Sequence, residues 1–314
     1  MKNTAIWYRH FGVPEQTLKL ETAPMGLLTP DLMRVRMLLS PVNASDLIPV
    51  TGAYGHRVKP PLVAGYEGVG QVISAPESWS HLVGKRVLPL CGQGTWQSFV
   101  DCPSEFAIPV PDWIDSDLAA RAYINPVAAM MMLRLYAPEG KHVLLTAAGS
   151  DCGLLLGQWA LRLGALSVTG IHRSAAHASR LAACGITSVS LEDVVAISRF
   201  ASGSDLVFDA TGGELATSIL QQLPESSTFI SYGLLSGNPF KQQHPRPVVR
   251  WFHIRNYLNS WNSQQWHSLF SEIWSLLNTS MYSDSVRYPL YSWKEAICFY
   301  RESGRTGKPL LVMN

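Results

Sequence analysis

Short apolar runs alternate with helix-like stretches through the middle of the chain. Val143–Leu145 is an apolar run typical of a buried parallel strand, and Ala147–Gly153 is a turn of small residues. Leu154–Leu163 then places apolar residues at helical spacing, and Gly164 is typical of a helix C-terminus. A second apolar run, Val168–Ile171, completes the pattern. The stretch therefore predicts one βαβ unit, with a strand, a tight turn, a helix and a second strand.

The same alternation continues towards the C-terminus. Asp205–Ala210 and Thr228–Tyr232 are apolar runs that end in glycine-containing turns, Thr211–Gly213 and Tyr232–Leu234. Strands that alternate with helices predict an α/β fold with a Rossmann-type, doubly wound parallel sheet. Ligands bind at the carboxyl ends of such strands, so both turns are candidates for the edge of a cofactor site.

The first third of the chain has a different pattern of hydrophobic and polar residues. Pro and Gly split it into short runs that predict a β-rich domain, with strands over Ala5–Tyr8, Leu32–Leu39, Gly68–Ile73, Arg86–Leu90, Trp96–Val100 and Phe106–Ile108. Pro109–Asp112 marks its boundary. Asp117–Tyr136 is apolar and helix-like, and we expect Asn125–Pro126 to break it. Near the C-terminus, Trp293–Ser303 predicts a helix and Gly307–Met313 a closing strand.

Composition narrows the class of protein. The 314 residues are 47% hydrophobic and 15% charged, which suits two globular domains. A net charge of +2 gives no reason to expect a nucleic-acid partner. The five cysteines form no C-x-x-C pair, which favours a reduced, cytoplasmic protein. The first ten residues lack the apolar core of a signal peptide, and no apolar run reaches the length of a membrane span, so we expect no membrane partner.

The chemistry of the turn after the first strand points to a dinucleotide. Small residues let the backbone approach a pyrophosphate, and the N-terminus of the following helix favours its negative charge. Ala148, Ser150 and Gly153 occupy the three places of the G-x-G-x-x-G fingerprint, so only the last glycine is kept. Asp151 would repel a phosphate unless its side chain turns away. A turn that binds nothing remains the alternative.

The end of the second strand favours NADP(H) over NAD(H). Enzymes built for NAD place an acidic residue there to bind the ribose 2′-hydroxyl. This chain has His172-Arg173-Ser174 instead, without an acid. Arg173 can pair with a 2′-phosphate and Ser174 can donate a hydrogen bond to it. The alternative is a solvated surface arginine.

Motifs spread over nearly the whole chain resemble those of one protein family. They lie at Val42–Asp46, Thr51–Gly55, Gly65–Gly68, Gly94–Trp96, Asn125–Pro126, Ile171–Arg173, Ser231–Gly233 and Arg255–Trp261. In this order they resemble the zinc-free medium-chain dehydrogenase/reductase superfamily, and within it the mitochondrial-type trans-2-enoyl-thioester reductases and the related quinone oxidoreductases. The chain departs from the enoyl-reductase signatures at Ala44, Tyr66, Asp151, Arg255 and Tyr257.

The resemblance implies a fold, a reaction and a site. It implies a GroES-like catalytic domain over 1–112 and 280–314, an NADP(H)-binding domain over 113–279, and a homodimer. The implied reaction is the NADPH-dependent reduction of an activated C=C bond in a 2-enoyl thioester or related enone. Because negative charge develops on the substrate carbonyl and a proton must reach the α-carbon, we expect a phenol in the site. Tyr54 matches the catalytic tyrosine of the family, and Asn43 is the second catalytic candidate.

The remaining candidates are cofactor-binding residues. From the turn, the strand ends and the resemblance we expect NADPH to contact Asn125, Ala148, Gly149, Ser150, Asp151, Cys152, Gly153, His172, Arg173, Ser174, Tyr232, Gly233, Leu234, Tyr257, Leu258, Trp261 and Lys308. Asp46 and Glu67 are expected to hold loop backbone rather than to act as acids. Zinc members of the superfamily have histidine where this chain has Tyr66, so no metal is expected.

Three alternatives to an enoyl reductase stay open. One is an NADPH:quinone oxidoreductase with the same fold and cofactor. Another is an enzyme that reduces an enoyl group on a carrier protein. A third, of a different class, is a non-catalytic NADPH-binding protein, which the eroded glycines and Asp151 would allow.

Overall fold

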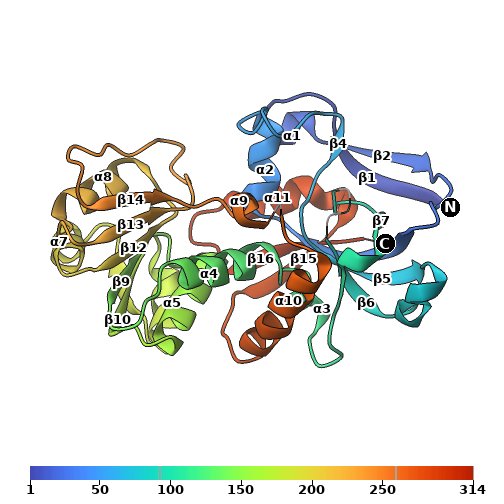
Figure 1. Cartoon of the computed structure of the whole chain (residues 1–314). Coiled ribbons are helices and arrows are strands. Elements are labelled where there is room, and N and C mark those ends of the chain that lie inside the picture. Colours follow the sequence, from blue (N-terminus) through green and yellow to red (C-terminus); the bar gives the residue numbers. More distant parts are fainter. Residues whose placement is uncertain (91, 93, 259, 314) are drawn as a thin grey trace.

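The computed structural model describes residues 1–90, 92, 94–258 and 260–313, which form two lobes (Figure 1). Cys91, Gln93, Asn259 and Asn314 lie outside the described residues, so the cysteine at 91 and the part of the family motif at 259 have no structural description. The lobe drawn in blue, cyan and red holds both ends of the chain, and the lobe drawn in green to orange holds its central part. None of the helices in these ranges combines the length and apolar character needed to cross a bilayer.

The central lobe is built on a parallel sheet. Six strands of the described chain run parallel in the order β11-β10-β9-β12-β13-β14. Their bounds are β9 His142–Leu145, β10 Ser167–His172, β11 Thr187–Ser190, β12 Leu206–Asp209, β13 Thr228–Ser231 and β14 Val248–Trp251. The strand order reverses between β9 and β12, which is the switch point where ligands bind in such sheets. The predicted Rossmann-type fold is confirmed.

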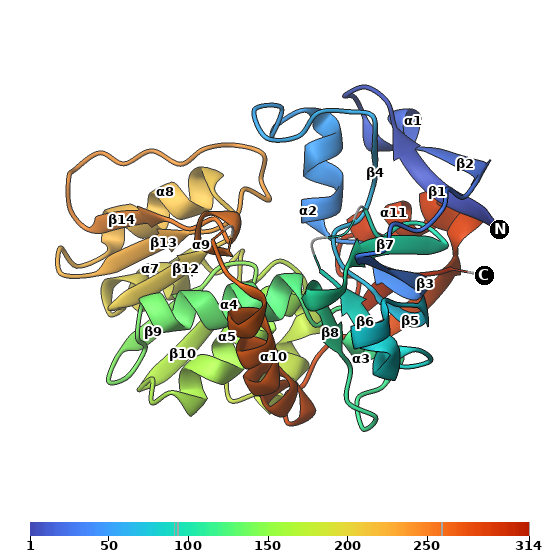
Figure 2. The same ribbon diagram turned by 45° about the vertical axis from the view of Figure 1, so that its right-hand side comes forward.

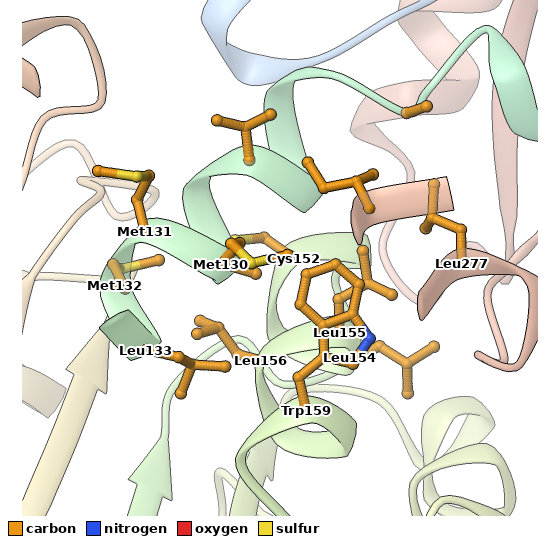
Figure 3. Packing of buried hydrophobic residues seen from close by; sticks show 14 of the residues in the cluster. Met130, Met131, Met132, Leu133, Cys152, Leu154, Leu155, Leu156, Trp159 and Leu277 are labelled. Carbon is orange, nitrogen blue, oxygen red and sulfur yellow. The ribbon is translucent and has the colours of Figure 1, made fainter. Parts of the chain in front are cut away.

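Helices cover both faces of this sheet. They are α4 Ile124–Leu135, α5 Asp151–Arg162, α6 Ala178–Ala183, α7 Val194–Ser202, α8 Gly213–Gln222, α9 Arg255–Leu258 and α10 Ser263–Asn278. Val143 and Leu145 of β9 belong to one hydrophobic cluster in which α5 lies against the sheet, α4 packs on α5, and α10 packs on α4. Figure 3 shows side chains of these helices meeting around Trp159. Leu144 points to the other face and packs with α7 and α8. Each large side chain removed from water in this way contributes about 1.5–3 kcal/mol to stability.

The other lobe is β-rich, as predicted, and its sheets are joined by the end of the chain. Within the described residues, β1 Lys2–Tyr8, β2 Lys19–Pro24 and β4 Leu62–Val63 form a three-stranded sheet. The larger sheet contains β3 Leu32–Pro41, β5 Val69–Ser74, β6 Arg86–Pro89, β7 Phe99–Pro103, β8 Ala107–Pro109, β15 Asp284–Pro289 and β16 Gly307–Val312. Because β16 pairs antiparallel with β3, the C-terminal segment returns to the first domain. We therefore propose the division into 1–112 with 280–314 and 113–279 for this structure.

Short helices complete the β-rich lobe. They are α1 Pro14–Thr17, α2 Ala44–Leu47 and α11 Trp293–Arg301, with a 3₁₀ turn, η1, at Ile48–Thr51. The short helix α3, Ser116–Ala119, follows the domain boundary and lies beside β3. The lobes meet where α10 packs against β8, and α2 of the first lobe and α9 of the second lie on opposite sides of the junction (Figure 2).

Several predicted boundaries shift by a few residues; the strand expected over Trp96–Val100, for example, is β7, Phe99–Pro103. Two of the differences have a clear physical cause. The helix expected from Leu154 begins at Asp151, because Ser150 caps it by accepting a hydrogen bond from the N–H of Gly153. Asn125–Pro126 does not break a helix but lies in the first turn of α4. A proline is tolerated there because the first backbone N–H groups of a helix have no intrahelical partner.

Candidate active site at the junction of the two domains

The turn between β9 and α5 is shaped by close backbone contacts. A Cβ atom on Gly153 would lie 2.8 Å from the carbonyl oxygen of Ala147, and one on Gly149 would lie 2.5 Å from Cγ of His177. Ala148 is buried, and Ser150 Oγ accepts a hydrogen bond from the N–H of Gly153 at 3.1 Å. The turn thus presents the N-terminus of α5 behind a backbone without bulky side chains, which is the arrangement that binds phosphate groups.

Asp151 begins α5, but its carboxylate points away from the turn and towards the other domain. Oδ1 accepts a hydrogen bond from Ser283 Oγ at 2.5 Å, and Oδ2 lies 3.4 Å from Nζ of Lys308. Burial opposes ionisation of this carboxyl, yet the positive charges of Lys308 and Arg121 outweigh it and hold its pKa at about 2. The acid that would repel a pyrophosphate is therefore ionised and paired with a lysine.

Asn43, the second catalytic candidate, lies at the centre of a buried polar network. Its Nδ2 donates to Glu67 Oε1 at 2.6 Å. Its Oδ1 accepts hydrogen bonds from Nδ2 of Asn125 at 3.3 Å and from Nζ of Lys308. The asparagine is 4% exposed and the lysine 3%. Lys308 thus joins Asn43 of the first domain to Asp151 at the start of α5.

Two buried carboxylates fix the loops around this network. Asp46 accepts the N–H groups of Asn43 at 2.7 Å and Tyr66 at 2.9 Å. Glu67 accepts the N–H groups of Tyr123 at 3.1 Å and Ile124 at 2.8 Å, at the start of α4. Burial raises the pKa of both carboxyls, and the neighbouring Glu67 helps to raise that of Asp46 to about 7. Both side chains hold loop backbone in place.

The end of β10 carries basic groups. Arg173 is exposed, and Ser174 Oγ accepts a hydrogen bond from the N–H of Ala176 at 3.3 Å. His172 is buried, with Nε2 at 2.7 Å from Ser188 Oγ. In the part of the chain that the structure describes, no hydrogen bond or ion pair to a carboxylate engages Arg173.

His177, which was not among the predicted site residues, follows this strand end and packs on Gly149. Burial, and then the charge of Arg180, lowers its pKa, so the imidazole is neutral at pH 7. A lone histidine in a loop has no spacing signal that would have singled it out.

The predicted cofactor residues Tyr232–Leu234 lie at the end of β13, and Cys152 lies in the first turn of α5. A Cβ on Gly233 would lie 2.8 Å from the carbonyl oxygen of Ala210, so β12 and β13 approach closely there. Leu234 is exposed, while burial raises the pKa of Tyr232. Cys152 is buried, its Sγ lies 3.9 Å from the carbonyl oxygen of Asn125, and burial raises its pKa to about 12.

A cavity of about 560 Å³ opens beside the turn after β12. It is bounded by the Thr211–Gly213 turn, which the sequence marked as a cofactor edge, and by residues of α7 and α8. The cavity lies at the carboxyl end of β12, and Val194 and Ile197 of α7 form part of its wall.

Tyr54 reaches the junction of the two domains from the loop after η1. Its half-buried ring meets the ring of His253 edge-on, with centroids 5.5 Å apart, and that of His56 at 6.4 Å. His253 lies between β14 and α9. Burial, and then the charge of Arg57, lowers the pKa of His253, so a neutral imidazole faces the phenol. The sequence showed no metal-ligand spacing around His253 and did not predict this contact.

The aromatic stretch after β14 packs mainly into the core. Tyr257 stacks on Phe252 with centroids 5.4 Å apart, Leu258 is buried, and Trp261 meets Trp266 edge-on at 5.5 Å. All three belong to or pack against the hydrophobic cluster under α10. Among the described residues, no three His, Cys, Asp or Glu side chains gather in positions suited to a metal ion.

Comparison with known proteins agrees with this architecture. Residues 29–112 match the family model of the alcohol dehydrogenase GroES-like domain. The chain is similar to a Bacillus thuringiensis protein named "putative NADPH:quinone reductase", with 30% identity, 99% of both chains covered and a TM-score of 0.91. It is 27% identical over 283 residues to the mitochondrial enoyl-[acyl-carrier-protein] reductase of Homo sapiens, covering 86% of this chain and 76% of the relative. Its fold resembles that of Etr1p, solved with NADP and crotonyl-CoA, with 20% identity, a TM-score of 0.82 and coverage of 99% and 100%.

Proposed function

The chain belongs to the medium-chain dehydrogenase/reductase superfamily, and from that membership we propose that it reduces an activated C=C bond with NADPH and without zinc. The substrate class is a 2-enoyl thioester or a related enone. Its relatives include an enoyl-[acyl-carrier-protein] reductase, and a structure of similar fold holds NADP with crotonyl-CoA. A cytoplasmic location and a homodimer stay predictions.

The proposed NADPH site consists of the turn and the basic strand end. The residues fit the cofactor, because Gly149 and Gly153 leave the backbone uncovered at the N-terminus of α5 and Asp151 turns away from it. We propose that Arg173 and Ser174 bind the 2′-phosphate, and the absence of an acid paired with this arginine in the described residues supports this. When bound, NADPH supplies the hydride. We propose that the other cofactor-binding residues named from the sequence also line the NADPH site. Lys308 and Asp151 contribute to it through their ion pair.

Two side chains of the first domain are proposed to act on the substrate. The phenol of Tyr54 donates a hydrogen bond to the carbonyl oxygen as it gains negative charge, and supplies the proton that the α-carbon needs. The amide of Asn43 orients the reacting groups, and Lys308 and Glu67 hold that amide in one rotamer. Neutral His253 packs against Tyr54 and excludes water from one side of it.

The observation that supports the proposal most directly is the contact of Tyr54 with His253 across the domain junction. It places a phenol of the catalytic domain against the nucleotide domain. The test is NADPH oxidation by the purified protein with a crotonyl thioester, an enal and a quinone, with NADH alongside. Turnover of the thioester or the enal with NADPH supports the proposal. Tight NADPH binding without any turnover would favour a non-catalytic protein.

Quinone reduction is the second candidate, because the chain is 30% identical to a protein named "putative NADPH:quinone reductase". A quinone accepts hydride without a proton placed on carbon, so this reaction depends less on a defined proton donor. Tyr54→Phe separates the two functions. Loss of most activity supports the enoyl reductase, and little change supports the quinone reductase.

A further inference from the structure

Two residues at which the chain departs from the enoyl-reductase signature form one contact at the domain junction. Tyr66 lies in the loop before β5, and Arg255 is the first residue of α9. The guanidinium carbon of Arg255 lies 4.3 Å from the centroid of the Tyr66 ring. Tyr66 is held in turn by a side-chain hydrogen bond with buried Tyr8. This cation–π contact holds the guanidinium over the ring but supplies no counter-ion for its charge.

The surroundings of Arg255 are positively charged. Exposed Arg57 donates a hydrogen bond from Nη2 to Oδ1 of Asn256, the residue next to Arg255, at 3.1 Å. Both arginines act electrostatically on His253, which packs against Tyr54. Over the described ranges, neither arginine forms an ion pair with a carboxylate.

The two acids beside Tyr66 cannot neutralise this charge. Asp46 and Glu67 are buried, and their oxygens accept hydrogen bonds from backbone N–H groups and from Asn43. Two guanidinium groups therefore lie close to His253, the residue that packs against the proposed proton donor, and of their nitrogens only Nη2 of Arg57 has a hydrogen-bond partner among the described residues, Asn256. A planar guanidinium stacked on a ring presents its edge for two parallel hydrogen bonds to a carboxylate.

We propose that Arg255, assisted by Arg57, binds a carboxylate carried by the substrate close to its reducible double bond, and so determines specificity. The inference rests on the proposed function, because it places the reacting bond beside Tyr54. A carboxylate is favoured over a thioester carrier's phosphate because a long flexible chain separates that phosphate from the double bond. Arg255 follows His253 by two residues, and the ring of His253 packs against that of Tyr54.

The test compares a matched pair of enones, trans-4-oxo-2-pentenoic acid and its methyl ester, which differ in one negative charge. For the wild-type protein, kcat/KM for the acid should exceed that for the ester at least about tenfold, the scale of one charge-assisted contact. Arg255→Gln should abolish this ratio, mainly by raising KM for the acid. Arg255→Lys should keep part of it. The control is Arg199→Gln, since Arg199 also stacks on a ring, that of Phe200 at 4.8 Å, but belongs to α7.

Calorimetric binding of the acid in the presence of NADP⁺ keeps the inference separate from the proposed function. If neither these compounds nor a crotonyl thioester is reduced, the proposed function fails, while acid binding that is lost in Arg255→Gln still supports the inference. The inference is overturned if the wild-type protein reduces or binds the acid and the ester equally, or does not bind the acid. It is also overturned if Arg255→Gln leaves the acid-to-ester ratio of kcat/KM unchanged. An effect of Arg255→Gln on crotonyl-CoA but not on crotonyl-N-acetylcysteamine, with acid and ester equal, assigns the arginine to a phosphate and also overturns it.

Discussion

Oδ2 of Asp151 lies 3.4 Å from Nζ of Lys308, and the two side chains are only 11% and 4% exposed. The pair joins the first residue of α5 to the closing strand β16, and Lys308 also donates to Asn43. From the sequence, Asp151 is expected to repel a bound phosphate unless its side chain turns away. In the structure it links the two domains.

Removal of this carboxylate should destabilise the protein. Asp151→Asn leaves the charge of Lys308 buried without its partner, which costs about 3 kcal/mol of unfolding free energy. The measurement is the denaturant midpoint of unfolding. Asp117→Asn is the control, because it breaks an ion pair with Arg287 whose side chains are 24% and 60% exposed, worth less than about 1 kcal/mol. Equal losses in the two variants would contradict the role given to Asp151.

The buried carboxyl of Asp46 should make stability depend on pH. Burial and the neighbouring Glu67 raise its pKa from 3.8 to about 7, so between these values the folded state binds more protons than the unfolded state. The unfolding free energy should therefore fall as pH rises from 4 to 7. Asp46→Asn should flatten this slope, measured as the unfolding midpoint at several pH values. An unchanged slope would show that Asp46 does not titrate in this range.

Arg173 should set the preference for NADPH. Arg173→Gln removes the proposed partner of the 2′-phosphate and should raise KM for NADPH about tenfold or more, with KM for NADH unchanged. The measurement is oxidation of both cofactors with one substrate. Arg162→Gln is the control, because Arg162 is the last residue of α5, at the end opposite the proposed phosphate site, and donates a hydrogen bond to Thr279. Equal use of NADH and NADPH by the wild-type protein would remove the role given to Arg173.

The parts of the fold predicted well are those in which local sequence and buried environment agree. The apolar run of β9 and the helical spacing of α5 specify their elements regardless of neighbours. β2 was missed because it is a largely exposed strand without alternation, and β4 because it spans two residues. The helix α10 was also missed, although Asn262 and Gln265 form a capping box and its apolar residues follow helical spacing.

The residues of the candidate site also fall into those that a local motif indicates and those that only the fold brings together. The turn and the strand end were predicted because each is a local motif with its own chemistry. The contacts of Lys308 with Asp151, of Tyr54 with His253 and of Tyr66 with Arg255 join residues far apart in the chain. Only the packing of the two domains brings them together, so no local pattern contains them.

The most direct test of the account is the oxidation of NADPH by a crotonyl thioester, followed for the wild-type protein and for Tyr54→Phe. The wild type should oxidise one NADPH for each thioester reduced, and Tyr54→Phe should lower kcat about a hundredfold without changing the thermal unfolding midpoint. An equally active Tyr54→Phe variant, or a wild type that reduces quinones but no enoyl thioester or enone, would contradict it.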